Sequence, residues 1–504
     1  MPRALSECVV RTEAMAKPRA RDGVETAPPS PTTPHDASFP GAASSSDSDA
    51  SDGAADVSRC VREMLRAMGE DVEREGLMDT PARVAKALAF AMRGYDACPT
   101  AALGTALFNE DGLARASSAS TKEDIELGTN DVVLVRDIPV FSTCARTFMP
   151  FYGVIHVGYA PRAGVIVGLS KLARVAEVYS RRLQTPDGLA RAVAQALDDV
   201  ASPLGVGVMF TGMQLGPFEP RKMEGWASTG CFAATNSVWW DEFSALVELG
   251  GGPSELSRGI WGDESRCGSC DNVQGGRVAT TRGETETMMD AAASRAASEV
   301  DESVFSSVSK LLRALNLEKR VSEATDGEVT LEDTAKRYSQ LLAAMRSGAD
   351  VPFNLIAESA PRDGESNDGV DEIEDGVCVT RDLHMSTVCE HHLLPFHGTV
   401  SAAYMTGPGA QPLSRDTLQA IVSRHSRRLQ VQERLTRDIA EEISTLTGGV
   451  GVIVAARASH LCMVSRGVEK PGSSTCTAVK LGRFAREPAL RARVWKRLCA
   501  TGNL

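Results

Sequence analysis

The pattern of apolar and polar positions occurs twice along the chain, in the same order. Apolar residues recur at helical spacing over 76–94 and again over 329–348. In each half a run typical of strands follows, GVIHVGY in the first and GTVSAAY in the second. Two amphipathic helices come next, at about 170–200 in the first half and about 414–446 in the second. A β-branched run ends each half, GVGVMFTG and GVGVIVAAR. Each half therefore predicts a helical segment, two strands, two helices and two more strands.

Direct matches show that the two halves are repeats of each other. The segment VRDIPVFSTCARTFMPFYGVIHVGY, from Val135, aligns with TRDLHMSTVCEHHLLPFHGTVSAAY, from Thr380, and YSRRLQ aligns with HSRRLQ. We predict a tandem duplication with an N-domain at 56–249 and a C-domain at 294–487. Strands followed by segregated helices favour an α+β fold, in which paired helices cover a mainly antiparallel sheet.

Three segments outside the repeats have a different composition. Residues 1–55 are rich in Ala, Ser, Pro and Asp and predict a disordered tail, and 250–293 predicts a flexible linker. The pair Cys267 and Cys270 in this linker has no second pair nearby, so we interpret it as incidental. The basic segment 488–504 is expected to be a solvated helix rather than a binding patch.

Charge and composition exclude several classes of protein. The net charge of -12 offers no general attraction to nucleic acid, and no run of 18 apolar residues exists that could span a membrane. The 12 cysteines are too sparse for a disulfide scaffold, and no apolar signal-peptide core opens the chain. We expect a cytoplasmic protein without nucleic-acid or membrane partners.

Two motifs in the C-domain have the composition of a metal site. They are CEHHLLPF and SHLCMVSRG. Alternate residues of an extended chain share a face, so His460 and Cys462 can point into one pocket, while Cys389 and His392 can meet across a turn. Three protein ligands with one open position are typical of catalytic zinc.

The remaining C-domain histidines lack such spacing. We interpret them as ordinary core or surface residues: His384, His397 and His425.

Taken together, the C-domain motifs resemble those of GTP cyclohydrolase I, whose pattern is CEHH, an LSK-x-x-R helix, QVQERLT and H-x-C-M-x-x-RG. The tandem arrangement is similar to the two-domain plant and algal form. This resemblance implies two T-fold (tunnelling-fold) domains and a Zn²⁺ ion held by Cys389, His392 and Cys462. It also implies that His391 and His460 transfer protons.

The resemblance further implies where the substrate GTP binds. Gln432 and Glu433 would recognise the guanine, with Arg466 and Glu390 also at the substrate. A carboxylate such as Glu433 only accepts hydrogen bonds, which suits the N1–H and 2-amino donors of guanine. Without the motif, a solvated charge on a helix face would be the better interpretation of Glu433.

One element of the pattern is divided between the two domains. In the C-domain, PLSRDTLQAIV has Arg415 near the lysine position of LSK-x-x-R and no matching arginine, whereas GLSKLARV in the N-domain keeps Ser170, Lys171 and Arg174. In the N-domain CEHH is replaced by residues 144–147, CART, so this domain cannot build the zinc site. We expect a homo-oligomer with composite active sites between N-type and C-type domains. The alternative is that Lys171 and Arg174 are leftover surface charges.

The resemblance implies a complete reaction. Water attacks C8 of the purine, the imidazole ring opens, and formate and 7,8-dihydroneopterin triphosphate form at the start of folate and pterin synthesis. Zinc would lower the pKa of bound water, and a nearby imidazole titrates in a suitable range. Two other classes stay open: a T-fold relative with a different reaction, such as a thiol-based nitrile reductase, and a non-catalytic regulatory or assembly protein.

Overall fold

The computed structural model describes residues 47–104, 106–109, 131–214, 221–233, 237–249, 301–347, 371–373, 376–465 and 473–499. The predicted linker with Cys267 and Cys270, most of the predicted tail, and Arg466 lie outside these residues. Helix α1 begins at Asp47, inside the segment expected to be a tail, since its buried positions from Val57 onward anchor a helix that extends toward the N-terminus.

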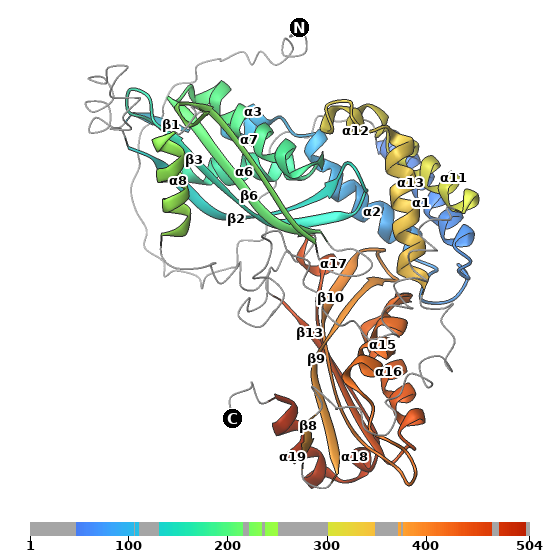
Figure 1. Cartoon of the computed structure of the whole chain (residues 1–504). Helices are drawn as coiled ribbons and strands as arrows, with labels where there is room; N and C mark the ends of the chain where they lie inside the picture. The colour runs from blue at the N-terminus through green and yellow to red at the C-terminus, as the bar shows by residue number, and fades with distance from the viewer. Residues whose placement is uncertain are drawn as a thin grey trace, which may run out of the picture. The chain divides into compact units, whose positions relative to one another are not determined.

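Each repeat builds one large sheet, and the two large sheets have the same strand order (Figure 1). In the N-domain the order is β5-β2-β3-β6-β7, and in the C-domain it is β11-β9-β10-β12-β13, with β8 also paired to β9. The N-domain strands are β2 (Val133–Cys144), β3 (Pro150–Ala160), β5 (Leu183–Gln184), β6 (Gly205–Gln214) and β7 (Arg221–Gly230). The C-domain strands are β8 (Asp371–Ile373), β9 (Val377–Cys389), β10 (Pro395–Met405), β11 (Leu429–Gln430), β12 (Gly451–His460) and β13 (Thr475–Gly482).

The long strands pair antiparallel, and the short strands β5 and β11 pair parallel to β2 and β9. Two helices pack on one face of each sheet: α6 (Leu169–Ser180) and α7 (Pro186–Ala201) in the N-domain, and α15 (Arg415–Ser426) and α16 (Gln432–Leu446) in the C-domain. This arrangement confirms the predicted α+β class and the order of elements. The short parallel strands were not predicted, because two residues carry no periodic signal.

The shared Arg-Asp dipeptide forms the same bulge in both sheets. Asp137 and Asp382 have positive φ angles of 57° and 54°. The strand register shifts beside each of them. Their backbone N–H groups are bonded to His156 and Ser401, which occupy matching positions in β3 and β10. The repeat therefore extends to local backbone geometry.

A layer of helices from both repeats forms one shared core. Its members are α1 (Asp47–Ala67), α2 (Thr80–Met92), α11 (Glu302–Ala314), α12 (Glu318–Ala324) and α13 (Leu331–Arg346). Buried Leu65 of α1 and Leu312 of α11 belong to the same apolar cluster, together with Phe148 from the β2–β3 turn and Leu393 from the β9–β10 turn. Figure 1 shows α1, α11 and α13 side by side. Neither repeat could bury this helical surface alone.

The remaining elements are short or peripheral. They are η1 (Arg93–Tyr95), α3 (Pro99–Leu103), β1 (Leu107–Asn109), β4 (Val165–Val167), η2 (Cys231–Ala233), α8 (Val238–Glu248), α17 (Leu461–Val464), α18 (Arg483–Arg486) and α19 (Pro488–Cys499). Helix α19 lies in the basic C-terminal segment; its Leu490 and Val494 are buried against β9 and β10, whereas Arg493 and Arg497 are exposed.

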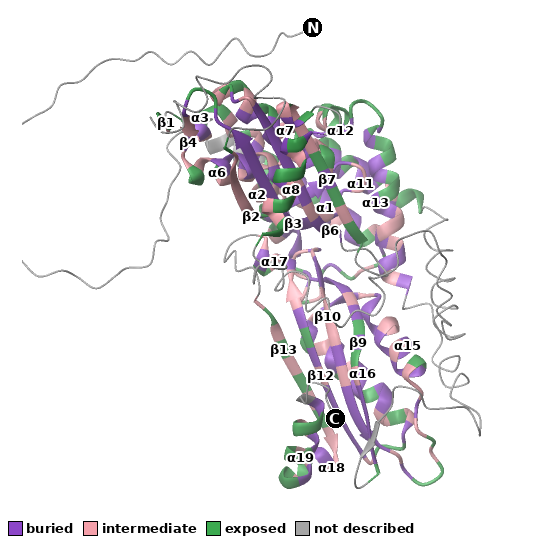
Figure 2. Cartoon of the chain, turned by 60° about the vertical axis from the view of Figure 1, so that its left-hand side comes forward, coloured by how far each residue is buried: buried purple, intermediate pink, exposed green. Residues whose placement is uncertain are grey.

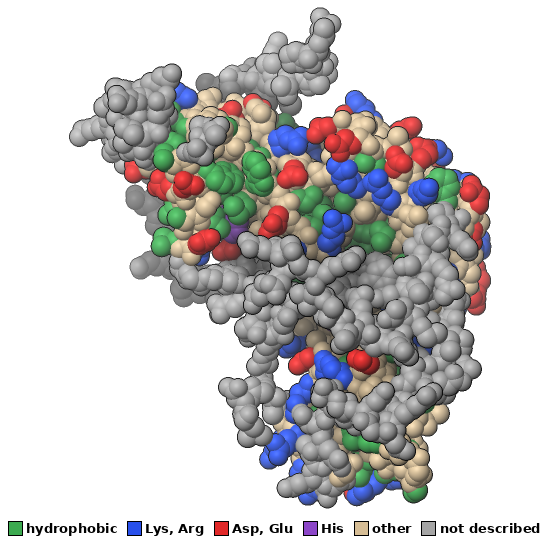
Figure 3. Space-filling view, in the orientation of Figure 1, with side chains coloured by type: hydrophobic (Ala, Val, Ile, Leu, Met, Phe, Trp, Pro, Cys, Tyr) green, Lys and Arg blue, Asp and Glu red, His purple; other side chains and the backbone are tan. Residues whose placement is uncertain are grey.

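Burial follows this architecture. Figure 2 shows that β3 and β10, at the centres of the two sheets, are largely buried. On the face drawn in Figure 3, basic and acidic side chains intermingle over the helical layer, where Arg146 pairs with Glu328 and Arg313 with Glu332. No helix in the described part of the chain combines the length and the apolar character that crossing a membrane requires.

Candidate active site

A tight turn after β9 brings a thiol and an imidazole together. Cys389 ends β9, and its N–H and carbonyl bond Leu394 and Leu393 across the turn. Leu393 has a φ of 52°, which is uncommon for a residue with a side chain and tightens the reversal. As a result His392 Nδ1 lies 4.0 Å from Cys389 Sγ.

Cys462 completes a cluster of three possible metal ligands. It lies in α17, directly after β12, and the ligand atoms of Cys389, His392 and Cys462 all lie within 4.8 Å of one another. The hydrogen bond with the Cys462 thiol, and those with His392 and His460, lower the pKa of the Cys389 thiol far below its usual range, although burial raises it. A thiolate next to a thiol and an imidazole suits a borderline-soft divalent ion such as zinc.

His460 is held beside this cluster by Gln432. The buried Gln432 amide donates through Nε2 to the carbonyl oxygens of Ala456 and Thr475, both at 3.0 Å. Its Oε1 is therefore the acceptor that lies 2.8 Å from His460 Nε2. The His460 ring also stacks on Phe396, with 4.3 Å between ring centroids. The Gln432 contact therefore favours a proton on Nε2 of His460.

Glu390 lies in the same turn but faces the helical layer. Its side chain is 4% exposed and accepts hydrogen bonds of 2.7 Å from both Arg74 and Arg434. Burial raises the pKa of Glu390, but the two arginines outweigh burial and hold it below its ordinary value. His391, which is more exposed, has Nε2 at 3.9 Å from the Glu390 carboxylate.

The other predicted substrate residues lie on two helices. Glu433 is exposed in the first turn of α16, directly after Gln432. Ser170, Lys171 and Arg174 lie on the N-domain helix α6, where Ser170 and Arg174 are exposed and Lys171 is half-buried. Among the described residues, the side chains of Lys171 and Arg174 form no ion pair. Helix α6 belongs to the N-domain, whereas Cys389 and Cys462 belong to the C-domain.

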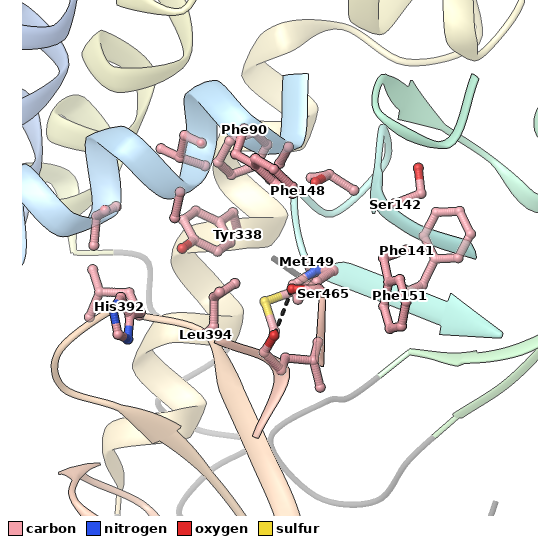
Figure 4. Close-up of a pocket in the computed structure, with 18 of the residues that line it drawn as sticks. Phe90, Phe141, Ser142, Phe148, Met149, Phe151, Tyr338, His392, Leu394 and Ser465 are labelled. Atoms are coloured by element: carbon pink, nitrogen blue, oxygen red, sulfur yellow. Dashed lines mark hydrogen bonds between the residues drawn. The ribbon is translucent and has the colours of Figure 1, made fainter. Parts of the chain in front are cut away.

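A small apolar cavity adjoins the metal-ligand turn. It has a volume of about 70 Å³, and Figure 4 shows His392, Tyr338 and Phe148 lining it from three different elements. Phe148 and Tyr338 pack edge to face with ring centroids 5.3 Å apart. Arg181 of the N-domain donates to the carbonyl oxygen of Ser465 at 2.7 Å on the same boundary. The turn is thus supported by both repeats and by the helical layer.

The matching place in the N-domain has different chemistry. In the strand register, Phe151 of β3 lies opposite Gln214 of β6, and the matching Phe396 of β10 lies opposite His460 of β12. Gln214 therefore occupies the position of His460. Gln214 Nε2 donates to Thr147 Oγ1 at 3.0 Å, and Thr147 matches His392 in the repeat. A neutral hydrogen bond therefore occupies the position of the metal cluster.

Sequence reasoning missed the residues that support the site from the other repeat. Arg74 lies in the segment before α2, and Thr80 is the first residue of α2. Both donate hydrogen bonds to Glu390. The shared Asp-Thr dipeptide, 79–80 and 333–334, marked a common feature but gave no indication of its partner.

Comparison with known proteins agrees with these observations. A family model described as GTP cyclohydrolase I matches residues 57–217 and 307–498. GTP cyclohydrolase 1 of Solanum lycopersicum is 33% identical over 465 residues, covering 89% of this chain and 92% of the relative. The Arabidopsis thaliana protein of the same name is 32% identical over 465 residues, covering 89% and 91%. That of Chlorobium phaeovibrioides is 44% identical over 153 residues, covering 30% of this chain and 60% of the relative.

Proposed function

Because the chain belongs to the GTP cyclohydrolase I family and is a hydrolase of that type, we propose that it opens the imidazole ring of GTP with the help of a zinc ion. The products are formate and 7,8-dihydroneopterin triphosphate, at the entry to folate and pterin synthesis. The observation that carries this proposal is the cluster of Cys389, His392 and Cys462, with ligand atoms within 4.8 Å of one another.

Cys389, His392 and Cys462 would hold the zinc ion, which would supply Lewis-acid activation of the attacking water. His460 contributes proton transfer beside the ion, in the position that its contact with Gln432 fixes. His391, half-buried in the metal-ligand turn, is the second proton-transfer group. Gln432 acts through His460, since its amide donors are already bonded to backbone carbonyls.

Glu433 recognises the guanine. Its carboxylate is exposed one residue after Gln432, at the start of α16, and has room to accept from the N1–H and 2-amino groups. Lys171 and Arg174 bind the triphosphate, each charge-assisted contact contributing about 1.5 to 3 kcal/mol. They stand on a domain without the metal ligands, so the working site combines an N-type and a C-type domain of a homo-oligomer.

A direct assay tests this function. Purified protein with stoichiometric zinc should release one formate per GTP and yield a product that becomes a fluorescent pterin after oxidation. Cys389→Ser should abolish both signals. Binding of GTP without formate release by the zinc-loaded protein would refute the proposed reaction and favour a regulatory role.

A further inference from the structure

A second pocket lies where the helical layer meets the C-domain, lined in part by the two arginines that bond Glu390. Its volume is about 460 Å³, and four guanidinium groups line it from separate places in the sequence. Arg74 comes from the segment before α2, and Arg346 ends α13. Arg428 directly precedes β11, and Arg434 lies in the first turn of α16. Two carboxylates, those of Glu70 and Asp438, also line the pocket.

Three of the four arginines have carboxylate partners. Arg74 and Arg434 each donate to Glu390 at 2.7 Å. Arg346 Nε lies 3.5 Å from a Glu70 oxygen. Arg428 differs, because its Nε is buried and has no hydrogen-bond partner among the described residues. A buried N–H without an acceptor is unfavourable and requires an explanation.

The N-domain shows how such an arginine is satisfied when it has only a structural role. Arg182 matches Arg428 in the repeat, since YSRRLQ aligns with HSRRLQ. Arg182 donates to the carbonyl oxygens of Gly94 and Ala97, at 2.7 and 3.1 Å. Its guanidinium also lies over the ring of Tyr179, 4.9 Å from the centroid. Arg428 keeps the position without these acceptors, and its side chain lines the pocket.

The charges in and behind the pocket favour an anion. The four arginines outnumber the three carboxylates, those of Glu70, Glu390 and Asp438. An arginine presents a planar fork of donors that matches two oxygens of a phosphate group.

We propose that this pocket binds a phosphate group, either inorganic or carried by a small phosphorylated metabolite, with Arg428 as the principal donor and Arg346 as the second. The site is separate from the substrate triphosphate, which the proposed function assigns to α6 of an N-domain. Arg74 and Arg434 line the pocket and also donate to Glu390, which directly follows Cys389. A bound phosphate would therefore affect the metal-ligand turn through these two arginines.

The experiment titrates full-length protein with pyrophosphate at constant ionic strength, by calorimetry and by the shift in thermal midpoint. Arg428→Gln and Arg346→Gln should each weaken pyrophosphate binding at least tenfold and remove the thermal shift. Arg437→Gln is the matched control: Arg437 lies on α16, is 61% exposed and pairs with Glu441 outside the pocket. Its binding should equal that of the unchanged protein.

A second variant separates this site from the substrate site. The double change Lys171→Ala with Arg174→Ala should leave pyrophosphate binding intact, whatever it does to GTP turnover. Loss of binding in that variant, with Arg428→Gln unaffected, would overturn the proposal, as would absence of binding to the unchanged protein. Parallel titrations with orthophosphate and ribose 5-phosphate identify the source: tighter binding of the sugar phosphate supports a metabolite, and equal binding supports the inorganic ion.

Discussion

The hydroxyl of Thr80 donates a 2.8 Å hydrogen bond to the carbonyl oxygen of Glu390, 310 residues later in the chain. The matching Thr334 of the second repeat donates to the carbonyl oxygen of Ala145, also at 2.8 Å. Ala145 is the repeat counterpart of Glu390. Each repeat therefore sends its helical segment to the metal-site turn of the other repeat, or to the remnant of that turn.

This exchange predicts a stability effect. Thr80→Val should leave the buried Glu390 carbonyl without its donor and lower the free energy of unfolding by about 1 to 3 kcal/mol. Denaturant unfolding measures the change. Thr445→Val is the control, because Thr445 makes the same kind of bond, to Glu441, on an exposed helix face; its effect should stay within about 0.5 kcal/mol. Equal losses in both variants would argue against a structural role for the exchange.

The metal ligands and the proton-transfer residues should separate by metal content. Cys389→Ser, His392→Ala and Cys462→Ser should each lose zinc and activity together, since a three-ligand site has no spare donor. His391→Ala and His460→Ala should retain zinc while turnover falls about 100- to 10,000-fold. Elemental analysis beside a formate assay measures both quantities. An empty metal site in His391→Ala would show that the ligands are assigned incorrectly.

Guanine recognition should depend on one carboxylate. Glu433→Gln replaces an acceptor with an NH₂ group that faces the donors of the base, a mismatch worth about 1 to 3 kcal/mol. The KM for GTP should rise about 5- to 150-fold while zinc content stays unchanged. An unaltered KM would move guanine recognition to another residue.

The N-domain, which lacks the metal ligands, should bind the triphosphate of GTP. Lys171→Ala with Arg174→Ala should sharply reduce kcat/KM for GTP and leave zinc in place. A formate assay and metal analysis of the full-length variant measure both quantities. An unchanged kcat/KM would leave Lys171 and Arg174 as surface charges and reduce the N-domain to a scaffold.

A buried histidine predicts a pH effect on stability. Burial first, and then the charges of His384 and His460, lower the pKa of His397 to about 4, and the ring meets the Tyr152 hydroxyl at 2.7 Å. Between about pH 6.5 and the lowered pKa of His397, the unfolded chain binds a proton that the folded protein does not. The free energy of unfolding therefore falls as the pH falls through this range, and it levels off below the lowered pKa. The slope should not exceed about 1.4 kcal/mol per pH unit, because only one proton is involved.

The variant His397→Gln isolates this contribution. Glutamine can keep the bond to Tyr152 and does not titrate. The free energy of unfolding of the variant, measured at about pH 7, 6 and 5, should therefore depend less on pH than that of the unchanged protein. The same dependence in both proteins would assign it to other groups.

The sequence alone determined the duplication, the fold class and the composition of the candidate metal site. Those features are local: the strand and helix periodicities, the CEHH turn and the His-x-Cys pair each lie within short segments. The tertiary structure decided what surrounds them. The bonds from Arg74 and Thr80 to Glu390, and the shared core of α1 and α11, join residues hundreds of positions apart. Such contacts arise because each repeat must bury an apolar helical face that it cannot cover by itself, and no local pattern encodes which partner covers it.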